Sequence, residues 1–344
     1  MKKFINPTIK YIAERLNLSS ATVSRALNDY PYVQEDTRKK ILDLAKSLDY
    51  EINDIARSLK KRKSHTIGVI VPDISISFFS QAISGMEKVA YKAGYSIIVS
   101  QTHENLKREI QDTKALMSSR VDGLIVSVSS QTCEGDHFLR LQKQGIPVVF
   151  FDRVCENVKA SKVIADDFGG AFRAVEHLIQ SGFKKIAHFA GPEHLSMSKN
   201  RCEGYLSALE KYGCPIEKDL IIHGGFDEEA GKLAFHKLRQ QNIFPDAIFA
   251  INDWVAIGAY KEIKALGINI PDEIGLIGFS DSPTSYLLDP PLSSVTHPAM
   301  EMGEKSAELL IEQIQHKSDK FKPRICVIKT ALKTKGSSIR HISS

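Results

Sequence analysis

The first 50 residues alternate apolar and polar positions with the 3.6-residue period of a helix, in three separate runs. The first run follows Thr8 and the second follows Ser19 and Ser20, residue types that cap helix starts, while the third begins at about Glu35. The apolar positions that these runs direct inward are Ile9, Ile12, Ala13, Leu16, Val23, Ala26, Leu27, Ile41, Leu44, Ala45 and Leu48. Two short helices joined by a turn at 17–18, with a third for support, predict an all-α helix-turn-helix head over residues 1–50.

From Thr66 onward the pattern changes to short, continuous apolar runs separated by longer amphipathic stretches, such as Phe78–Ala93. Such runs are typical of parallel sheets that helices cover on both faces. We expect strands in TIGVIVP, YSIIVS, DGLIVSVS, IPVVFF, IAHFA, LIIHG, AIFAI, IGLIGF and RICVIKT. This length of chain exceeds one ordinary sheet. We therefore expect residues 66–344 to form two doubly wound α/β lobes, the first from about 66–164 and 298–322 and the second from about 165–297 and 323–344.

Residues 51–65 are basic and poor in apolar residues, and they predict a linker with one short helix from Asn53 to about Lys60. The charge of the chain is unevenly divided. Residues 1–63 hold 14 Lys and Arg against 8 Asp and Glu, a net of +6, whereas the other 281 residues hold 32 against 33, a net of −1. This asymmetry favours a nucleic-acid-binding head on a neutral body, with an inert basic terminus as the alternative.

Several classes of protein do not fit the sequence. No apolar stretch approaches the roughly 18–20 residues that span a bilayer, and the amino-terminal segment lacks the apolar centre of a signal peptide. The five cysteines are scattered without metal-ligand spacing, and no phosphate loop, nucleophile elbow or zinc motif is complete. We therefore expect a cytoplasmic protein that is not an enzyme, contacts no membrane and holds no metal or cofactor.

The second predicted helix carries groups suited to DNA. In a helix-turn-helix, the first residues of this helix reach base edges, and capping hydroxyls hold phosphates. Here Ser20 and Ala21 stand at the helix start, and Arg25 can donate to guanine O6 and N7. Serine, threonine and asparagine are poor helix formers, so their abundance over residues 19–28 favours binding over stabilisation. An exposed polar helix without a partner is the alternative.

Residues 8–28, TIKYIAERLNLSSATVSRALN, resemble the head of the lac repressor (LacI/GalR) family, T-x-x-D-[IV]-A-x-x-A-x-[VI]-S-x-x-T-V-S-R-x-[LI]-N. Residues 50–59, YEINDIARSL, resemble the family hinge, Y-x-P-N-x-x-A-R-S-L. Further segments follow in family order: IGVIVPDIS, VDGLIV, PVVFFDR, HLIQSGFKKIAHFAGP, RCEGY, INDWVAIGA, IPDEIGLIGF and PPLSSV. Because the likeness extends through nearly the whole chain, the protein is identified as a member of this family.

The resemblance implies a set of DNA-binding residues. In the family, the hinge becomes a helix only on operator DNA, and a leucine from each of two hinges enters the minor groove. Leu59 matches that leucine, and the basic residues 60–63 beside it suit phosphates. Ile52 replaces the family's proline, so the order of the free hinge stays open. The implied residues are Thr8, Ser19, Ser20, Ala21, Thr22, Ser24, Arg25, Asn28, Tyr32, Tyr50, Asn53, Ala56 and Leu59.

The resemblance also implies a body like the sugar-binding periplasmic proteins, whose two lobes close on a ligand. Matching positions around the cleft are Phe79, Asp152, Arg201, Phe226, Asn252, Asp253, Ser280 and Asp281. Aromatic faces suit a sugar ring, and the polar groups suit hydroxyls or a carboxylate. A structural role is equally open for each, Asp253 as a helix cap in particular, and Phe78 is expected in the core. Ser280 replaces a carboxylate that the family often has here.

These features predict a homodimeric transcription regulator, a repressor in the simplest reading, that binds near-palindromic double-stranded operator DNA. One head alone buries too little DNA surface for operator-grade affinity. No leucine heptads follow RHISS, so a tetramer-forming tail is not expected. We expect a small sugar or sugar derivative as effector. Arg201 and Ser280 favour an effector that carries a carboxylate, a phosphate or a dense array of hydroxyls. Neutral sugars are nearly as well supported.

Two other hypotheses stay open. In the first, the chain is the same kind of DNA-binding regulator, but its effector is a purine, a nucleoside or a phosphoprotein co-regulator. In the second, the chain is a solute-binding protein that does not regulate genes. The sequence leaves open which effector and operator are used, and whether the ligand releases or strengthens DNA binding.

Overall fold

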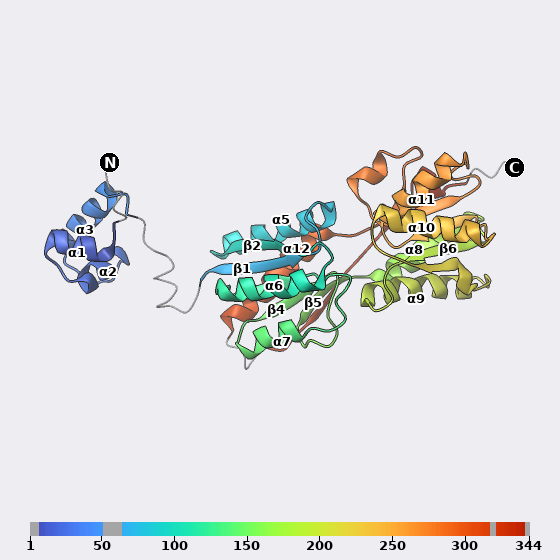
Figure 1. Ribbon diagram of the computed structural model, residues 1–344. Coiled ribbons are helices and arrows are strands. Elements are labelled where there is room, and N and C mark those ends of the chain that lie inside the picture. Colours follow the sequence, from blue (N-terminus) through green and yellow to red (C-terminus); the bar gives the residue numbers. More distant parts are fainter. Residues whose placement is uncertain (1–6, 51–63, 317–320, 341–344) are drawn as a thin grey trace. The chain divides into compact units, whose positions relative to one another are not determined.

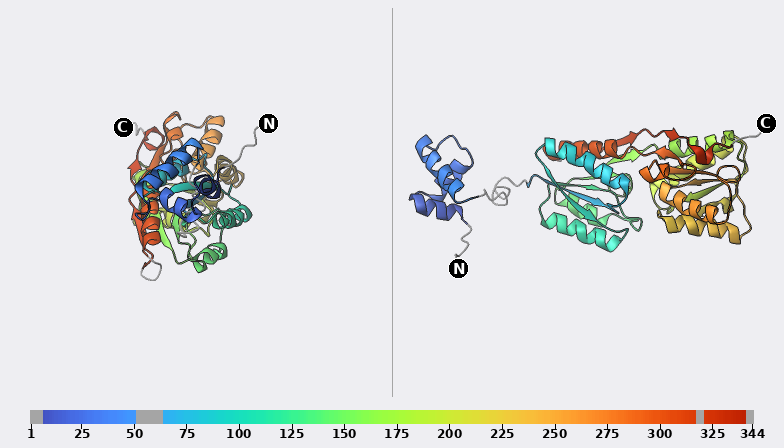
Figure 2. Two further views of the ribbon diagram at one scale, coloured as in Figure 1. Left: turned by 90° about the vertical axis from the view of Figure 1, so that its left-hand side faces the viewer. Right: turned by 90° about the horizontal axis from the view of Figure 1, so that it is seen from above.

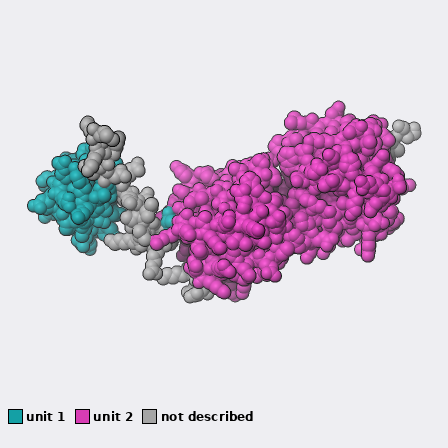
Figure 3. All heavy atoms as spheres, viewed as in Figure 1, with its two compact units in different colours: residues 1–64 teal, residues 65–344 magenta. Residues whose placement is uncertain are grey.

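The computed structural model describes residues 7–50, 64–316 and 321–340. The chain divides into two compact units, residues 1–64 and residues 65–344 (Figures 1 and 3). The short helix predicted from Asn53 to about Lys60 lies outside the described residues.

The first unit contains the three predicted helices: α1 (Ile9–Leu16), α2 (Ser20–Leu27) and α3 (Glu35–Ser47). One fully buried β-branched residue from each helix, Ile12, Val23 and Ile41, forms the centre of their common core. Helical periodicity therefore gave the correct elements and the correct inward faces.

The second unit is built around two six-stranded sheets. The first has the order β11-β5-β4-β3-β1-β2, and all its pairings are parallel. The second has the order β12-β10-β9-β8-β6-β7, and it is parallel except for the antiparallel pairing of β12 with β10. The predicted fold class, two doubly wound α/β lobes, is confirmed.

The strands of the first sheet are β1 (Thr66–Val71), β2 (Ser96–Gln101), β3 (Gly123–Val126), β4 (Val148–Phe151), β5 (Ser161–Ala165) and β11 (Ile325–Ile328). Those of the second are β6 (Ile186–Ala190), β7 (Ile221–His223), β8 (Ala247–Ala250), β9 (Gly275–Ser280), β10 (Ser293–Thr296) and β12 (Leu332–Lys333). Predominantly apolar strands such as β1 and β8 are buried along almost their whole length, because helices cover both of their faces.

Helices pack in pairs on the sheets (Figures 1 and 2). In the first lobe, α5 (Ser77–Lys92) pairs with α12 (Ala299–Gln315), and α6 (Leu106–Ser118) contacts α7 (Asp136–Lys143). In the second lobe, α8 (Asp167–Gln180) pairs with α9 (Ser196–Lys211), and α10 (Glu228–Gln240) pairs with α11 (Asp253–Ala265). Short 3-10 helices occupy Lys218–Leu220, Pro283–Tyr286 and Gly336–Ser338.

The predicted lobe boundaries need one correction. Residues 323–344 were assigned to the second lobe, but β11 pairs with β5 in the first sheet, so the chain crosses to the second lobe only after Ile328. β11 is an edge strand in which Ile325 is 64% and Val327 57% exposed. Because this strand is half exposed, its sequence does not indicate which of the two sheets it joins.

Three strands were not predicted at all: β5, β10 and β12. β5 is interrupted by Lys162, β10 contains two serines, and β12 has only two residues. Their places depend on neighbouring strands rather than on their own apolar content.

Candidate nucleic-acid interface and ligand cleft

Side-chain caps begin both α1 and α2. The Thr8 Oγ1 accepts the Tyr11 N–H at 3.2 Å, and the Ser19 Oγ accepts the Thr22 N–H at 3.1 Å. Asn17 ends α1 in the left-handed conformation, at a φ of 51°, which asparagine tolerates better than most residues. The chain thus reverses between two helices of eight residues each.

The predicted DNA-binding residues of α2 other than Thr22 lie on one helical face. Positions 20, 24 and 28 and positions 21 and 25 follow each other at four-residue spacing. Ser19, Ser20, Ala21 and Arg25 are exposed, whereas Thr22, Ser24 and Asn28 are half-buried. The Arg25 carbonyl accepts the Tyr30 N–H at 3.0 Å, but its guanidinium makes no hydrogen bond or ion pair with another described residue and is available to a partner. The face remains a predicted DNA interface.

Other residues of the predicted set differ in their surroundings. Tyr32 is 89% exposed, whereas Tyr50 packs against the core of the head and is half-buried. The Asn28 amide donates to the Ser24 carbonyl at 2.7 Å and so serves the end of α2. Asn53, Ala56 and Leu59 lie outside the described residues.

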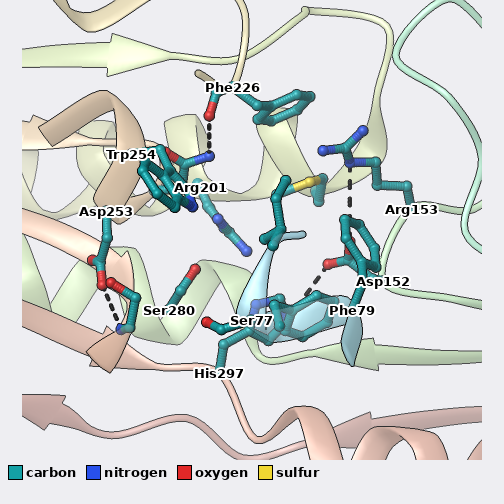
Figure 4. A pocket seen from close by; sticks show the side chains of 15 residues that line it. Ser77, Phe79, Asp152, Arg153, Arg201, Phe226, Asp253, Trp254, Ser280 and His297 are labelled. Atoms are coloured by element: carbon teal, nitrogen blue, oxygen red, sulfur yellow. Dashed lines mark hydrogen bonds and ion pairs between the residues drawn. The ribbon is translucent and has the colours of Figure 1, made fainter. Parts of the chain in front are cut away.

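A cavity opens at the carboxyl ends of strands from both sheets (Figure 4). Phe78 and Phe79 follow β1, Asp152 follows β4, Asn252 follows β8, and Ser280 ends β9. Both sheets reverse their strand order here, at β1 and at β6, and open α/β sheets place ligands at such reversals. The lining residues are Ile76, Ser77, Phe78, Phe79, Asp152, Arg153, Met197, Arg201, Phe226, Asn252, Asp253, Trp254, Ser280, Ser282 and His297.

Asp152 is a buried carboxylate in this cleft. Its Oδ1 lies 3.4 Å from His297 Nε2, and its Oδ2 lies 3.9 Å from Arg153 Nε. Burial raises the pKa of Asp152 to about 6, against the charges of Arg153 and Arg201, which lower it. Burial also lowers the pKa of His297 well below its usual value, and the Arg201 charge acts in the same direction. The histidine is therefore neutral at pH 7.

The Arg201 guanidinium lies in the middle of the cleft (Figure 4), and three contacts with the second lobe hold it there. Its Nε donates to Asp167 at 2.8 Å, its Nη1 donates to the Ile251 carbonyl at 2.5 Å, and its guanidinium lies 3.5 Å from the Phe279 ring centre. The side chain is only 1% exposed. These contacts fix the guanidinium plane within the lining of the cavity.

Asn252 and Asp253 make hydrogen bonds to other residues of the second lobe. The Asn252 Oδ1 caps α11 by accepting the Val255 N–H, and its Nδ2 donates to the Phe226 carbonyl, both at 2.8 Å. The two Asp253 oxygens accept from the Ser282 N–H and the Ser294 hydroxyl, each at 2.6 Å. Both residues line the cleft, but their hydrogen bonds organise its wall.

Two family descriptions match the chain over these regions. "Bacterial regulatory proteins, lacI family" matches residues 8–57, and "Periplasmic binding proteins and sugar binding domain of LacI family" matches residues 64–335. The chain belongs to the LacI family. The two matches take in the helix-turn-helix and both α/β lobes, so this LacI-family protein is a DNA-binding transcription regulator.

Relatives of this LacI-family chain match it over nearly its whole length. The probable HTH-type transcriptional repressor ExuR of Bacillus subtilis is 36% identical over 91% of this chain and 93% of its own. The ribose operon repressor of Haemophilus influenzae is 30% identical over 94% of this chain and 98% of its own. The solved lac repressor dimer, bound to operator and the anti-inducer ONPF, shares the fold with a TM-score of 0.82 at 24% identity, over 97% of this chain and 100% of that one.

One predicted cleft residue of the LacI-family chain is misplaced. Asp281 is absent from the lining, because its carboxylate accepts from Lys333 at 2.7 Å and from Lys335 at 2.8 Å. Although burial alone raises its pKa, these hydrogen bonds lower the pKa of Asp281 below its usual value. The lysines come from the last part of the chain, which the sequence pattern could not place beside residue 281.

Other lining residues were not predicted. Arg153 donates to Glu104 at 2.6 Å and lies 4.0 Å from the Phe226 ring centre, so it links the two lobes. Trp254 and His297 also line the cavity. Phe78 belongs to the buried core of the first lobe, as expected, and it also borders the cavity, where its ring stacks on His297 at a centre distance of 4.0 Å. Arg153 and Trp254 could have been predicted, because they directly follow the predicted cleft residues Asp152 and Asp253 in the sequence. His297 follows β10, which the pattern missed.

No helix among the described residues is long and apolar enough to cross a membrane. Over the same residues, no group of three or more histidine, cysteine and acidic side chains has an arrangement that could hold a metal ion.

Proposed function

We propose that the cleft binds a small sugar or sugar derivative, and that this ligand controls how tightly a homodimer holds near-palindromic operator DNA, with the protein acting as a repressor. The observation that carries the proposal is the mixed character of the cavity. Aromatic rings of Phe79, Phe226 and Trp254 lie in one lining with the polar groups of Asp152 and Arg201. Sugar rings need apolar faces and directional hydrogen bonds together.

The relatives support the same role, since one is named a ribose operon repressor and the lac repressor was solved as a dimer on its operator. The proposal contains no catalytic step, because its relatives are repressors and the lining groups bind and orient. Since the target is bacterial DNA, we expect the protein to act in the cytoplasm.

Ligand binding must rearrange this cleft. The cavity measures about 50 Å³, far below the roughly 300 Å³ or more of ordinary ligand pockets. The lining comes from both lobes, and Arg153 of the first lies against Phe226 of the second. A ligand therefore has to move the lobes or their facing side chains. Such a movement gives the ligand different affinities for two conformations, which control of DNA binding requires.

Calorimetric titration with neutral sugars, sugar acids, sugar phosphates, purines and nucleosides tests the proposal. We expect one sugar-type ligand to bind and to change operator affinity by about 5- to 150-fold. Operator DNA should change the affinity for that ligand by the same factor, because linkage is reciprocal. Binding without any effect on DNA would leave a solute-binding protein, and tight binding of a purine or nucleoside alone would replace the sugar.

A further inference from the structure

Buried polar groups of the cleft contain nitrogen atoms without hydrogen-bond partners. Over the described residues, these are Arg153 Nε, Arg201 Nη2 and His297 Nε2. The two arginine atoms can only donate, and the histidine atom donates when it carries the ring proton. The Arg201 Nη2 lies 2.7 Å from Asp167 Oδ1 but makes no hydrogen bond with it. His297 Nε2 and Arg153 Nε likewise lie 3.4 and 3.9 Å from Asp152 oxygens without a hydrogen bond to them. Buried donors whose hydrogen bonds are not made cost free energy, so a ligand that supplies well-placed acceptors binds favourably here.

The carboxylate and amide acceptors in the same cleft are mostly occupied. Both Asp253 oxygens already accept hydrogen bonds, and the Asn252 oxygen caps α11. Asp281 faces two lysines outside the lining. Ser280 stands at the position where the resemblance places a carboxylate. Asp152 is therefore the one carboxylate of the described lining that is free to accept hydrogen bonds from a ligand's hydroxyls.

From this excess of donors we propose that the effector is a sugar acid, whose carboxylate meets Arg201 and lies on the Ser280 side of the cleft. The inference rests on the proposed sugar-type function and narrows it. A carboxylate brings acceptors and no donor, and charge-assisted bonds to a guanidinium are stronger than bonds between neutral groups. A hydroxyl of a neutral sugar also donates a hydrogen bond, and besides Asp152 the free acceptors of the lining are hydroxyls such as Ser282 Oγ, which donate as well.

The remaining lining fits the rest of such a ligand. Asp152 accepts from ring hydroxyls, while Phe79, Phe226 and Trp254 cover the apolar ring faces. The Ser280 side chain points into the cleft on the side of Arg201 (Figure 4), and its hydroxyl makes no hydrogen bond to another described residue. A carboxylate introduced at position 280 would therefore occupy the place of the ligand's own.

Two substitutions at this position separate charge from shape. Ser280→Asp adds a carboxylate, and Ser280→Asn adds nearly the same shape without charge. In both variants the residue at position 280 keeps the same positive φ of 129°, so any backbone strain is the same in the two and cancels in the comparison. Arg201 is not the residue to change, because its loss would strand the buried carboxylate of Asp167. Operator binding and thermal unfolding should be alike in the two variants.

The titration uses glucuronate, galacturonate and gluconate beside glucose, galactose and glucose 6-phosphate. We expect an acid to bind wild type at least 10-fold more tightly than the matching neutral sugar. We also expect Ser280→Asp to lose at least 10-fold more of that affinity than Ser280→Asn.

Equal or tighter binding of a neutral sugar or of the phosphate would overturn the sugar acid while the sugar-type function stands. An equal loss in the two variants would overturn the placement of the carboxylate. If neither acids nor neutral sugars bind, the proposed function falls with the inference.

Discussion

Two aspartates at strand ends show how surroundings decide the chemistry of one residue type. Asp152 follows β4 and Asp281 follows β9, and both adopt a positive φ, of 58° and 50°. Asp152 is buried beside the neutral His297, whereas Asp281 is held by Lys333 and Lys335. Burial raises the pKa of the first to about 6, while the lysines lower the pKa of the second in spite of burial. Sequence alone gives the two residues the same candidate role.

Asp152→Asn should stabilise the protein at neutral pH. The folded-state pKa of Asp152 lies above its ordinary value of 3.8, so the folded state binds more protons between pH 4 and 6. Stability therefore falls as pH rises through this window, and the full penalty, roughly 3 kcal/mol, is present above pH 6. Asparagine keeps the shape and tolerates the positive φ. Urea unfolding should show the gain at pH 7.5 and none below pH 4.

Asp281→Asn is the matched control, and its effect should have the opposite sign. The depressed pKa of Asp281 contributes stability above its ordinary pKa, which is lost as pH falls. The variant should be less stable than wild type at pH 7.5. Equal shifts of the two variants in one direction would contradict both assignments.

Glycines at helix contacts set how closely the elements of each lobe approach. A Cβ on Gly258 of α11 would lie 1.9 Å from the Glu228 carbonyl oxygen of α10, and one on Gly303 of α12 would lie 2.0 Å from the Ala82 carbonyl oxygen of α5. Backbone cannot yield as a flexible side chain does, so any side chain here forces the helices apart. Because α11 starts with the cleft residues 253 and 254, helix spacing also sets the shape of the cleft.

Gly258→Ala should destabilise the second lobe by about 1–3 kcal/mol, the usual cost of overpacking a close contact. Ligand affinity should fall with it, because α11 carries cleft residues. Gly224→Ala is the control, since its Cβ would meet only the Ala230 Cβ, at an ordinary 3.6 Å. Thermal unfolding and calorimetry of both variants measure the difference. A Gly258→Ala protein as stable as Gly224→Ala would show that the helix pair can separate at little cost.

At the scale of the whole molecule, DNA contact and ligand contact belong to different units. The helix-turn-helix has its own buried core and its own caps, and the cleft lies wholly within residues 65–344. Each predicted site can therefore be changed without entering the other. The positive charge of the chain is concentrated in residues 1–63, which suits a head that meets phosphates.

Arg25→Ala should weaken binding to an operator selected from random DNA by about 1–3 kcal/mol and relax the preference for one guanine. Ligand binding should not change. Arg15→Ala is the control, because Arg15 is an exposed arginine of the same unit that already bonds the Tyr11 hydroxyl at 3.0 Å. Mobility shifts on selected and random DNA give the ratio of affinities. If Arg25→Ala lost as much on random DNA, Arg25 would contact phosphate rather than a base.

Local patterns in the sequence determined much of this protein. Caps such as Thr8 and Ser19, and the change from helical period to continuous apolar runs at Thr66, specified most elements and the fold class. These signals work because they depend on hydrogen bonds and burial within a few residues. Most of the predicted cleft residues also line the cavity, since strand ends of parallel sheets gather at one edge.

Only the tertiary structure decided which sheet β11 joins, where Asp281 points and that His297 belongs to the cleft. In each case the deciding partner is distant in the chain: β5 lies about 160 residues from β11, Lys335 lies 54 residues from Asp281, and Asp152 lies far before His297. A half-exposed edge strand or a polar strand end has no local pattern that names its partner. Packing of the two lobes supplies that partner, and with it the excess of donors in the cleft.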